Sequence, residues 1–552
     1  MEEKSLKIIS LGGFGEVTQN MFVYETPKDI LVVDCGVGFP EEDITGVDLI
    51  IPDISYLKNK EEKIRGIILS HGHEDHIGAL PYILPQFSKR IPVYGPKWAI
   101  ALSKLKCKEF GVLADFREFD EKTKISLGEF FLEFISVTHS IPDTYHLVIN
   151  TPLGIVYHAA DFKLDLTPVI GQATSQDKIK KVGQKGVLCL LSDCLRAEVA
   201  GFTPPENKLK KMFLEEMENC QGKFLVTTFS SNISRLKQAI EASLDYGRKI
   251  VLLGRSVKEN VKLARQLKYL NFKESIFLSK KEIKKYPPEK LTLLVAGSQG
   301  QLGSALDKIV SGEEEEVKIE PGDKVIFSTD YIPGNEAAIY RLIDNIYRLG
   351  GEVVYQDIHS GVHVSGHGFQ QDLAKLLKMV NPQYVIPIGG NFRHMVAYKR
   401  LALKEGFREK QILLPDKEEF VEFFPNNQVK ISQKFTPKKV FVDAYGVGDV
   451  GEIVLRDRKI LATEGIAVIF VLLNQETKRL IGEPEIISRG FVYIKKNLPL
   501  INQGKQKIIS LIKKNQGKDV YFLRQKIEEE IERFFFEKTG RKPMIVVLIM
   551  EV

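Results

Sequence analysis

The stretch Ser70–Gly78, which reads SHGHEDHIG, decides the fold. The apolar, β-branched run IRGIILS leads into it and is typical of a buried strand, so the stretch begins where a strand ends. It holds three histidines and one aspartate, namely His71, His73, Asp75 and His76. Imidazole and carboxylate groups are the ligands of zinc and similar divalent ions. Their density favours a metal site over a solvated polar loop.

The spacing of these residues indicates two groups of ligands. In an extended segment His71, His73 and Asp75 share one face, whereas Gly72 and a following helix let His76 turn to another side. We therefore predict two divalent metal ions. The ligand types favour zinc, and sites built from histidine and carboxylate also accept manganese.

Strands that end in a metal-ligand type of residue recur along the chain. The predicted strands 30–34, 130–137, 155–160 and 187–192 lead to Asp34, His139, Asp161 and Asp193, respectively. A β-sandwich with a metal-binding edge produces this pattern. Asp34 could orient a ligand histidine, and both Asp34 and Asp193 have the alternative of ordinary turn residues. His158 lies inside a predicted strand, and we interpret it as structural.

Composition limits the class of protein. A chain of 552 residues, 43% of them hydrophobic, can bury the cores of about three domains. The 78 basic and 72 acidic residues give a net charge of +6, which is compatible with RNA binding without establishing it. The five cysteines are scattered, no apolar run reaches the roughly 18–20 residues of a membrane span, and the N-terminus lacks a signal-peptide pattern. We therefore expect a soluble, cytoplasmic protein without disulfide bonds or membrane contact.

The pattern of the chain changes after residue 205. Between Glu206 and Tyr355, strands alternate with amphipathic helices, which predicts a separate, inserted domain with a parallel sheet. Histidines return in HSGVHVSGHG, where the metal-binding domain resumes. The predicted boundaries are 1–205 and 358–430 for the metal-binding domain, 206–357 for the insertion, 431–448 for a polar linker and 449–552 for a C-terminal α/β domain.

Several motifs resemble one protein family. HGHEDHIG is similar to the signature of the metallo-β-lactamase fold. Six further stretches resemble ribonuclease J, a branch of the β-CASP nucleases: LGGFGEVTQNMFVYE, VVDCGVGFPEEDITGVDLIIPD, TPLGIVYHAADFKLD, SGHG, ISRGFVYI and TGRKPMIVVLIMEV. The resemblance runs from about Leu6 to Val552. It implies an α/β fold in which an α/β β-CASP domain interrupts a metallo-β-lactamase αββα sandwich, followed by a small α/β C-terminal domain.

The resemblance also implies roles for the candidate residues. The implied ligands of one ion are His71, His73 and His139. The implied ligands of the other ion are Asp75 and His76, and Asp161 is implied to bind both ions. The implied catalytic residues are Asp75, Asp193 and His367, of which the last two match the family's motifs A and B. Asp193 would orient or exchange a proton, and His367 would contact the scissile phosphate or assist the leaving group. A buried structural histidine is the alternative for His367.

Two stretches could hold a phosphate group without metal. Ser230–Asn232 precedes a predicted helix, where hydroxyl and backbone N–H groups face an anion, and VSGHG offers polar groups near its histidine. In ribonuclease J such groups form a pocket for a 5′-monophosphate beside the metals. The implied pocket residues here are Ser230, Ser231, Asn232, Ser365, Gly366 and His367. An ordinary helix N-cap is the alternative for Ser230–Asn232.

One position departs from the family pattern. After the strand YVIP, ribonuclease J has a motif C histidine that binds the second ion, whereas this chain reads PIGGNFRHM and has Gly389 there. The second ion then keeps Asp75, His76, Asp161 and water, so we expect it to bind less tightly than the first. His394, five residues on, could replace the missing ligand from the first turn of a helix. The alternative leaves His394 on the helix surface and the second site three-coordinate.

We predict a metal-dependent ribonuclease that degrades 5′-monophosphate, single-stranded RNA in the 5′→3′ direction, with endonucleolytic ability, in RNA maturation and decay. The alternatives are a DNA-processing β-CASP nuclease, a small-molecule metallohydrolase of the same fold, and an RNA-binding scaffold. The scaffold would be weakly active because Gly389 replaces the motif C histidine. Other RNA-decay proteins are further predicted partners. The strand MIVVLIMEV carries almost no charge and would aggregate unless paired, which predicts a homodimer or homotetramer through the C-terminal domain.

Overall fold

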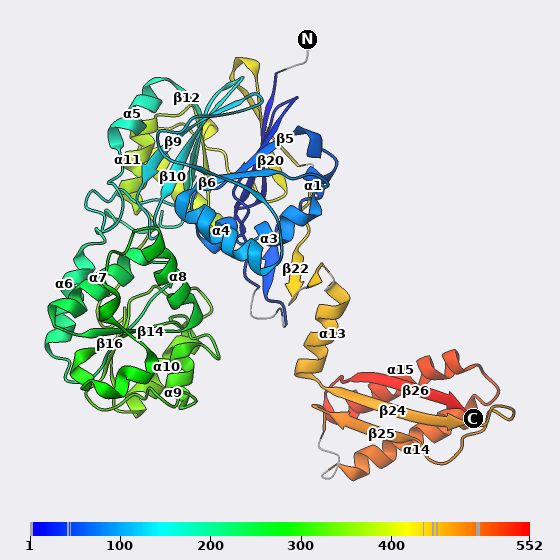
Figure 1. Ribbon diagram of the computed structural model, residues 1–552. Coiled ribbons are helices and arrows are strands. Elements are labelled where there is room, and N and C mark those ends of the chain that lie inside the picture. The colour runs from blue at the N-terminus through cyan, green and yellow to red at the C-terminus, as the bar shows by residue number, and fades with distance from the viewer. Residues whose placement is uncertain are drawn as a thin grey trace. The chain divides into compact units, whose positions relative to one another are not determined.

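The computed structural model describes residues 4–40, 44, 46–433, 435–443, 446–448, 451–492 and 497–552 (Figure 1). The chain divides into two compact units. The first unit comprises Met1–Gly38 and Ile51–Lys439, and the second comprises Phe39–Ile50 and Val440–Val552. Each unit has a hydrophobic core of its own.

Two sheets packed face to face form the centre of the first unit (Figure 1). The eight-stranded sheet, in spatial order, consists of β21 (Gln428–Gln433), β20 (Glu419–Phe424), β1 (Leu6–Gly12), β2 (Met21–Glu25), β3 (Ile30–Val33), β5 (Ile64–Ile68), β6 (Pro92–Pro96) and β7 (Asp115–Phe119). The six-stranded sheet consists of β19 (Tyr384–Ile388), β12 (Val187–Asp193), β11 (Gly154–Ala159), β10 (Thr144–Thr151), β9 (Phe130–Val137) and β8 (Ile125–Leu127). Alternate apolar side chains of both sheets fill the space between them, among them Ile8, Phe22, Phe134 and Leu191.

Helices on the outer faces complete an αββα sandwich. A second core, which includes Val182, Leu190, Leu376 and Tyr398, joins α5, α11 and α12 to the six-stranded sheet. The helices of this part of the chain are α1 (Ser55–Lys58), α2 (Glu74–Ile77), α3 (Leu80–Ile83), α4 (Lys97–Glu109), α5 (Gln176–Gln184), α11 (Gln370–Val380) and α12 (Phe392–Lys404). Short 3₁₀ turns lie at Glu61–Lys63, Leu84–Gln86, Glu409–Gln411 and Pro425–Asn427.

The inserted domain interrupts the sandwich between β12 and β19 and contains one parallel sheet (Figure 1). Its strands, in spatial order, are β15 (Phe277–Leu278), β14 (Lys249–Leu253), β16 (Leu291–Val295), β13 (Phe224–Thr227), β17 (Lys324–Phe327) and β18 (Glu352–Val354). Its helices are α6 (Lys208–Glu218), α7 (Ile233–Asp245), α8 (Arg255–Gln266), α9 (Ala305–Ser311) and α10 (Glu336–Arg348). Further 3₁₀ turns lie at Glu274–Ile276, Lys280–Lys285 and Pro288–Lys290. The predicted fold class, including this insertion, is confirmed.

The second unit is a small α/β domain. Its elements are β4 (Leu49–Ile51), which extends to the unit boundary, β22 (Val440–Asp443), β23 (Gly446–Val447), α13 (Glu452–Thr463), β24 (Ile466–Leu473), β25 (Glu485–Arg489), α14 (Leu498–Lys514), α15 (Val520–Thr539) and β26 (Met544–Glu551). Helices α14 and α15 cover one face of the sheet β25-β24-β26 through Ile508, Ile527 and Phe535. Asp519 caps the start of α15, and Gly540 ends it in the left-handed conformation that favours glycine.

Two local predictions differ from the structure, and a third falls partly outside the described residues. The predicted linker contains strands, because β21 is a polar edge strand that is held by backbone pairing to β20 and needs no apolar pattern. The stretch 36–53, whose proline, glycines and consecutive acidic residues predict a surface loop, instead contributes residues 39–50 to the second unit, where β4 pairs with β22. The stretch GFVYI at 490–494, whose aromatic and β-branched residues predict a strand, lies partly outside the described residues, because Tyr493 and Ile494 are not described; β25 ends before it, at Arg489.

Within the described ranges, none of the helices combines the length and the apolar composition that a membrane span needs.

Candidate metal centre

The histidine stretch lies at the carboxyl end of β5, where a loop leads into the one-turn helix α2. Backbone hydrogen bonds fix this loop against the turn that follows β3 and against the loop that precedes β2. The Cys35 N–H donates to the His76 carbonyl at 2.7 Å, and the Asn20 N–H donates to the Asp75 carbonyl at 2.9 Å. Gly36 permits this approach, because a Cβ there would lie 1.6 Å from the Asp75 carbonyl oxygen. The candidate ligands therefore project from a backbone that is held from both sides.

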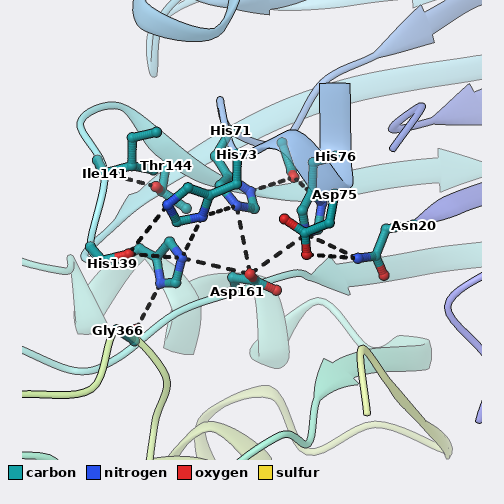
Figure 2. Close-up of polar contacts among 12 residues, drawn as sticks. Asn20, His71, His73, Asp75, His76, His139, Ile141, Thr144, Asp161 and Gly366 are labelled. Atoms are coloured by element: carbon teal, nitrogen blue, oxygen red, sulfur yellow. Dashed lines mark hydrogen bonds and ion pairs between the residues drawn. The ribbon is translucent and has the colours of Figure 1, made fainter. Parts of the chain in front are cut away.

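A first group brings three imidazoles and one carboxylate together, with ligand atoms within 4.8 Å of one another (Figure 2): His71, His73, His139 and Asp161. The Nδ1 of His73 lies 3.0 Å from His71 Nε2 and 3.1 Å from His139 Nε2. The Nδ1 of His139 donates to the Gly366 carbonyl at 2.7 Å, which leaves the Nε2 lone pair facing the group. A cation between these nitrogens would stabilise them, and tetrahedral zinc, with bonds of about 2.0–2.1 Å, suits this donor set.

Burial keeps the three rings of this group uncharged. The pKa of His71 and the pKa of His139 lie well below the ordinary value, first because both rings are buried and then because other histidines adjoin them. Burial lowers the pKa of His73 to about 3. Neutral imidazole is the form that binds a metal ion, so the protonation state suits metal binding.

A second group consists of Asp75, His76 and Asp161. Buried Asp34 fixes the His76 ring, because the His76 Nδ1 lies 2.7 Å from Asp34 Oδ2 and its Nε2 is left for the group. The Ser70 N–H donates to Asp34 Oδ1 at 2.7 Å, and the Ser70 hydroxyl donates to Asp34 Oδ2 at 2.8 Å. The strand-end residue Asp34 therefore lies where it can orient a ligand histidine.

Asp161 lies between the two groups (Figure 2). Its Oδ2 is 3.6 Å from His71 Nε2, 3.6 Å from His139 Nε2 and 3.5 Å from His76 Nε2. Burial opposes ionisation of this carboxyl, but the nearby charges of His76 and His367 hold the pKa of Asp161 well below its ordinary value. An ionised carboxylate in this position can bridge two cations.

Asp193 and His367 form a third group with Asp161. Asp193 is the last residue of β12, and its Oδ2 lies 2.8 Å from His367 Nδ1. The His367 Nε2 is 3.9 Å from Asp161 Oδ2. Burial opposes protonation of His367, but the two carboxylates raise its pKa to about 9. A protonated imidazole held this way can donate a proton to a leaving group at neutral pH.

Gly389 follows β19 and borders this centre. A Cβ at Gly389 would meet Asp161 Oδ1 at 3.9 Å and Asp193 Oδ1 at 4.0 Å, and nothing nearer. Space for a side chain therefore exists beside the second group, at the position where the sequence lacks a histidine. The φ of Gly389 is +65°, which a side chain would strain.

The structure does not support His394 as the replacement ligand. His394 belongs to none of the ligand groups that the described residues form. Its Nδ1 accepts the Asn391 N–H at 3.1 Å, and its Nε2 lies 3.5 Å from Glu198 Oε2. The ring turns back towards the N-cap residue Asn391, because it completes the cap of α12.

The residues expected to bind a terminal phosphate fall into two sets. Gly366 lies at the metal centre through its bond to His139, and the Ser365 hydroxyl accepts the His367 N–H at 3.1 Å. Asn232 behaves as the ordinary N-cap of α7, since its side chain accepts the Arg235 N–H. Ser230 Oγ accepts from the Asn260 amide at 3.2 Å, and Ser231 is half-buried beside it. The Arg235 guanidinium donates to the Val364 carbonyl at 2.9 Å, which ties the start of α7 to the segment before Ser365.

Sequence reasoning missed two features. The buried Asn20 amide lies 3.2 Å from His76 Nε2 and 3.4 Å from Asp75 Oδ2, but a single asparagine in a loop has no distinguishing pattern. Glu206 joins the inserted domain to the sandwich by bonding Lys163 and Arg235, and all three side chains are buried. Only the fold brings these three together, so spacing could not reveal them.

An αββα sandwich with paired histidine and aspartate groups at one edge defines a hydrolase of the metallo-β-lactamase class. Protein-family models agree along the chain. The metallo-beta-lactamase superfamily matches residues 14–164, the ribonuclease J beta-CASP domain matches 221–346, the Zn-dependent metallo-hydrolase RNA specificity domain matches 350–415, and the ribonuclease J C-terminal domain matches 453–552.

Full-length relatives give the family. Ribonuclease J2 of Bacillus subtilis is 37% identical over 100% of this chain and 99% of its own length. Ribonuclease J of Thermus thermophilus is 36% identical over 99% of this chain and 95% of its own. A solved protein of unknown function from Enterococcus faecalis covers 78% of this chain and 100% of its own, with a TM-score of 0.52 and 14% identity, which shows a shared fold alone. The chain belongs to the ribonuclease J family, a family of metal-dependent ribonucleases.

Proposed function

We propose that the chain removes nucleotides from the 5′-monophosphate end of single-stranded RNA in the 5′→3′ direction, with endonucleolytic ability, during RNA maturation and decay. The observation that carries this proposal is the position of Asp161 between two ligand groups, with His367 beside it. Two carboxylate-bridged cations and an adjacent proton donor suit the hydrolysis of a phosphodiester bond.

The chemistry of the donor groups supports zinc as the resident metal. We propose that His71, His73 and His139 hold one ion and that Asp75 and His76 hold the other, with Asp161 shared. Imidazole nitrogens in a tetrahedral set favour zinc, whereas the second group is poorer in nitrogen and also suits manganese. When bound, the ions neutralise charge on the phosphodiester and lower the pKa of a water molecule.

The chain's own residues then position the reaction. Asp34 orients His76, and the Gly366 carbonyl orients His139, so that each Nε2 faces its ligand group. His367, charged at neutral pH and held by Asp193, donates its proton to the departing 3′-oxygen. Asp75 takes part in catalysis as a proposed metal ligand of the second group.

A pocket for the 5′-phosphate would set the direction of hydrolysis. We propose that Ser365, Gly366 and His367 bind this group together with Ser230, Ser231 and Asn232. The bond between Gly366 and His139 supports a pocket that adjoins the metal centre, so that one nucleotide separates the end from the scissile bond. A triphosphate end is bulkier and more highly charged, so it should fit such a pocket poorly.

A second candidate function is a weakly active RNA-binding scaffold. Gly389 favours it, because the second group has two carboxylates and one imidazole, and the described residues add no fourth ligand side chain to it. On this alternative the chain binds RNA alongside other RNA-decay proteins and hydrolyses it slowly. Turnover with added zinc or manganese distinguishes the two functions.

Self-association through the C-terminal domain is the proposed assembly, as a homodimer or homotetramer. β26 is the edge strand of its sheet among the described residues, and the face away from α14 and α15 exposes Leu472 (41%), Leu548 (40%) and Met550 (57%). A second copy would cover this apolar surface and the open strand edge. The five cysteines are unpaired and buried, which is consistent with the cytoplasm as the proposed location.

The decisive experiment compares RNA ends. The purified chain is incubated with RNA that carries a 5′-monophosphate or a 5′-triphosphate, and with DNA of the same sequence, each with and without zinc or manganese. We expect mononucleotides to appear from the 5′ end of the monophosphate RNA, faster than from the triphosphate RNA. Equal rates on both ends, or products that begin at the 3′ end, would refute the pocket.

A further inference from the structure

The inserted domain has a cavity of about 560 Å³ at the carboxyl ends of two neighbouring parallel strands, β14 and β16. The chain leaves these strands towards opposite faces of the sheet. Val257 and Val261 of α8, after β14, pack in one core, whereas Leu306 and Ile309 of α9, after β16, pack in the other. Loops that part in this way open a crevice at the sheet edge, which is where α/β domains bind ligands.

The cavity carries an excess of positive charge. Its charged lining residues are Arg255, Lys258, Lys280, Lys308 and Glu314. Lys280 is neutralised, since its Nζ lies 2.7 Å from Glu314 Oε1. The side chains of the other three cations have no salt bridge or hydrogen bond to any part of the chain that the structure describes. Lys308 also interacts electrostatically with Glu314, so four cations face one carboxylate, and this excess of positive charge favours an anionic ligand.

The backbone at the cavity also suits an anion. Gly254 precedes α8 with a φ of +96°, and it offers no side chain to cap the first N–H groups of this helix. A Cβ at Gly254 would lie 2.5 Å from the Cβ of Ala296, so glycine permits this turn beside β16. The N–H groups of the first turn of α8 add to the attraction that the three cations exert on a phosphate group.

The lining also has an apolar part, which gives room for more than a phosphate. Leu253, Ala296, Ala305 and Ile309 provide this surface, and the volume lies within the roughly 300–1,000 Å³ of small-molecule sites. We propose that the cavity binds a nucleotide, with its phosphate held by Arg255, Lys258 and Lys308. The site is separate from the metal centre, and the proposal does not depend on the reaction there.

The test is calorimetric titration of the full chain with nucleoside 5′-monophosphates and with inorganic phosphate. A chelator keeps divalent ions out of the metal centre. The test variant combines Arg255→Ala, Lys258→Ala and Lys308→Ala, which are exposed positions whose loss should leave the fold intact. Because hydrogen bonds to charged groups are the strong ones, we expect its mononucleotide affinity to fall at least about tenfold.

A matched control removes the same charge outside the cavity through Lys262→Ala, Lys273→Ala and Lys318→Ala, three exposed positions of the inserted domain. The control should bind mononucleotides like the unmodified chain, and circular dichroism should show both variants folded. Equal mononucleotide binding by the cavity variant and the unmodified chain overturns the proposal, as does the absence of any binding by the unmodified chain. A cavity variant that loses affinity only for single-stranded RNA also overturns it, because the cations would then serve an RNA strand.

Discussion

Restoring an imidazole at position 389 tests how the second group holds its metal. The change Gly389→His places a side chain whose Cβ meets only Asp161 Oδ1 at 3.9 Å and Asp193 Oδ1 at 4.0 Å, which are ordinary contact distances. The φ of +65° costs about 1–2 kcal/mol for any residue with a Cβ. That strain lowers stability without touching the ligands, so the chain should still fold.

The expected gain is in metal affinity. Partners that merely orient a ligand are worth about 10–100-fold in metal affinity, so a direct fourth ligand should strengthen the second site at least about tenfold, or about 1.4 kcal/mol. Gly389→Ala is the matched control, because it carries the same backbone strain without an imidazole. The assay is a zinc titration of both variants, followed by hydrolysis of 5′-monophosphate RNA at limiting zinc.

The histidine and alanine variants should differ in zinc affinity. Tighter binding of the weaker zinc ion by the histidine variant, together with faster hydrolysis at limiting zinc, is the expected result. If the histidine and alanine variants bind zinc equally, the open space beside Gly389 does not belong to a metal site, and the explanation of weak second-site binding is wrong.

Three further changes have defined outcomes. Asp34→Ala frees the His76 ring, so zinc affinity at the second group should fall about 10–100-fold in a titration. Unchanged affinity would show that Asp34 does not orient His76 for metal binding. Burial lowers the pKa of His158 to about 4 from 6.5, so the folded state binds fewer protons and should lose about 3 kcal/mol as pH falls from 6.5 to 4. In denaturant titrations, the free energy of unfolding of His158→Gln should fall less with decreasing pH. The same pH dependence in both proteins would refute this role of His158. Leu548→Glu charges the exposed sheet face, so light scattering should give a smaller mass; the original mass would exclude this surface from the oligomer.

The sequence predicted the metal centre because its residues have a local signature. His71, His73, Asp75 and His76 are contiguous, and His139 and Asp161 follow strands that end at the same edge. Strands that end at the same edge bring such residues together, whatever the length and path of the loops that connect them. The structure groups these six side chains as the spacing and the family resemblance indicated.

Contacts between distant segments could not be predicted in this way. The cap that Asn391 forms with His394 decides where that ring points, and helical position alone left two orientations open. The polar edge strand β21 is held by its backbone, so its side chains have no pattern that separates it from a linker. The pairing of β4 with β22 joins segments about four hundred residues apart, and neither segment shows a partner in its own sequence.

Metal stoichiometry tests the central claim, that Asp161 joins two ions in one centre, most directly. The metal-free chain and its Asp161→Ala variant are titrated with zinc in a calorimeter, with circular dichroism to show that both are folded. We predict two binding events in the unmodified chain, the tighter one at the three imidazoles, and a loss of affinity at both sites in the variant. Two ions bound with undiminished affinity by Asp161→Ala, or a single ion in the unmodified chain at saturating zinc, would contradict it.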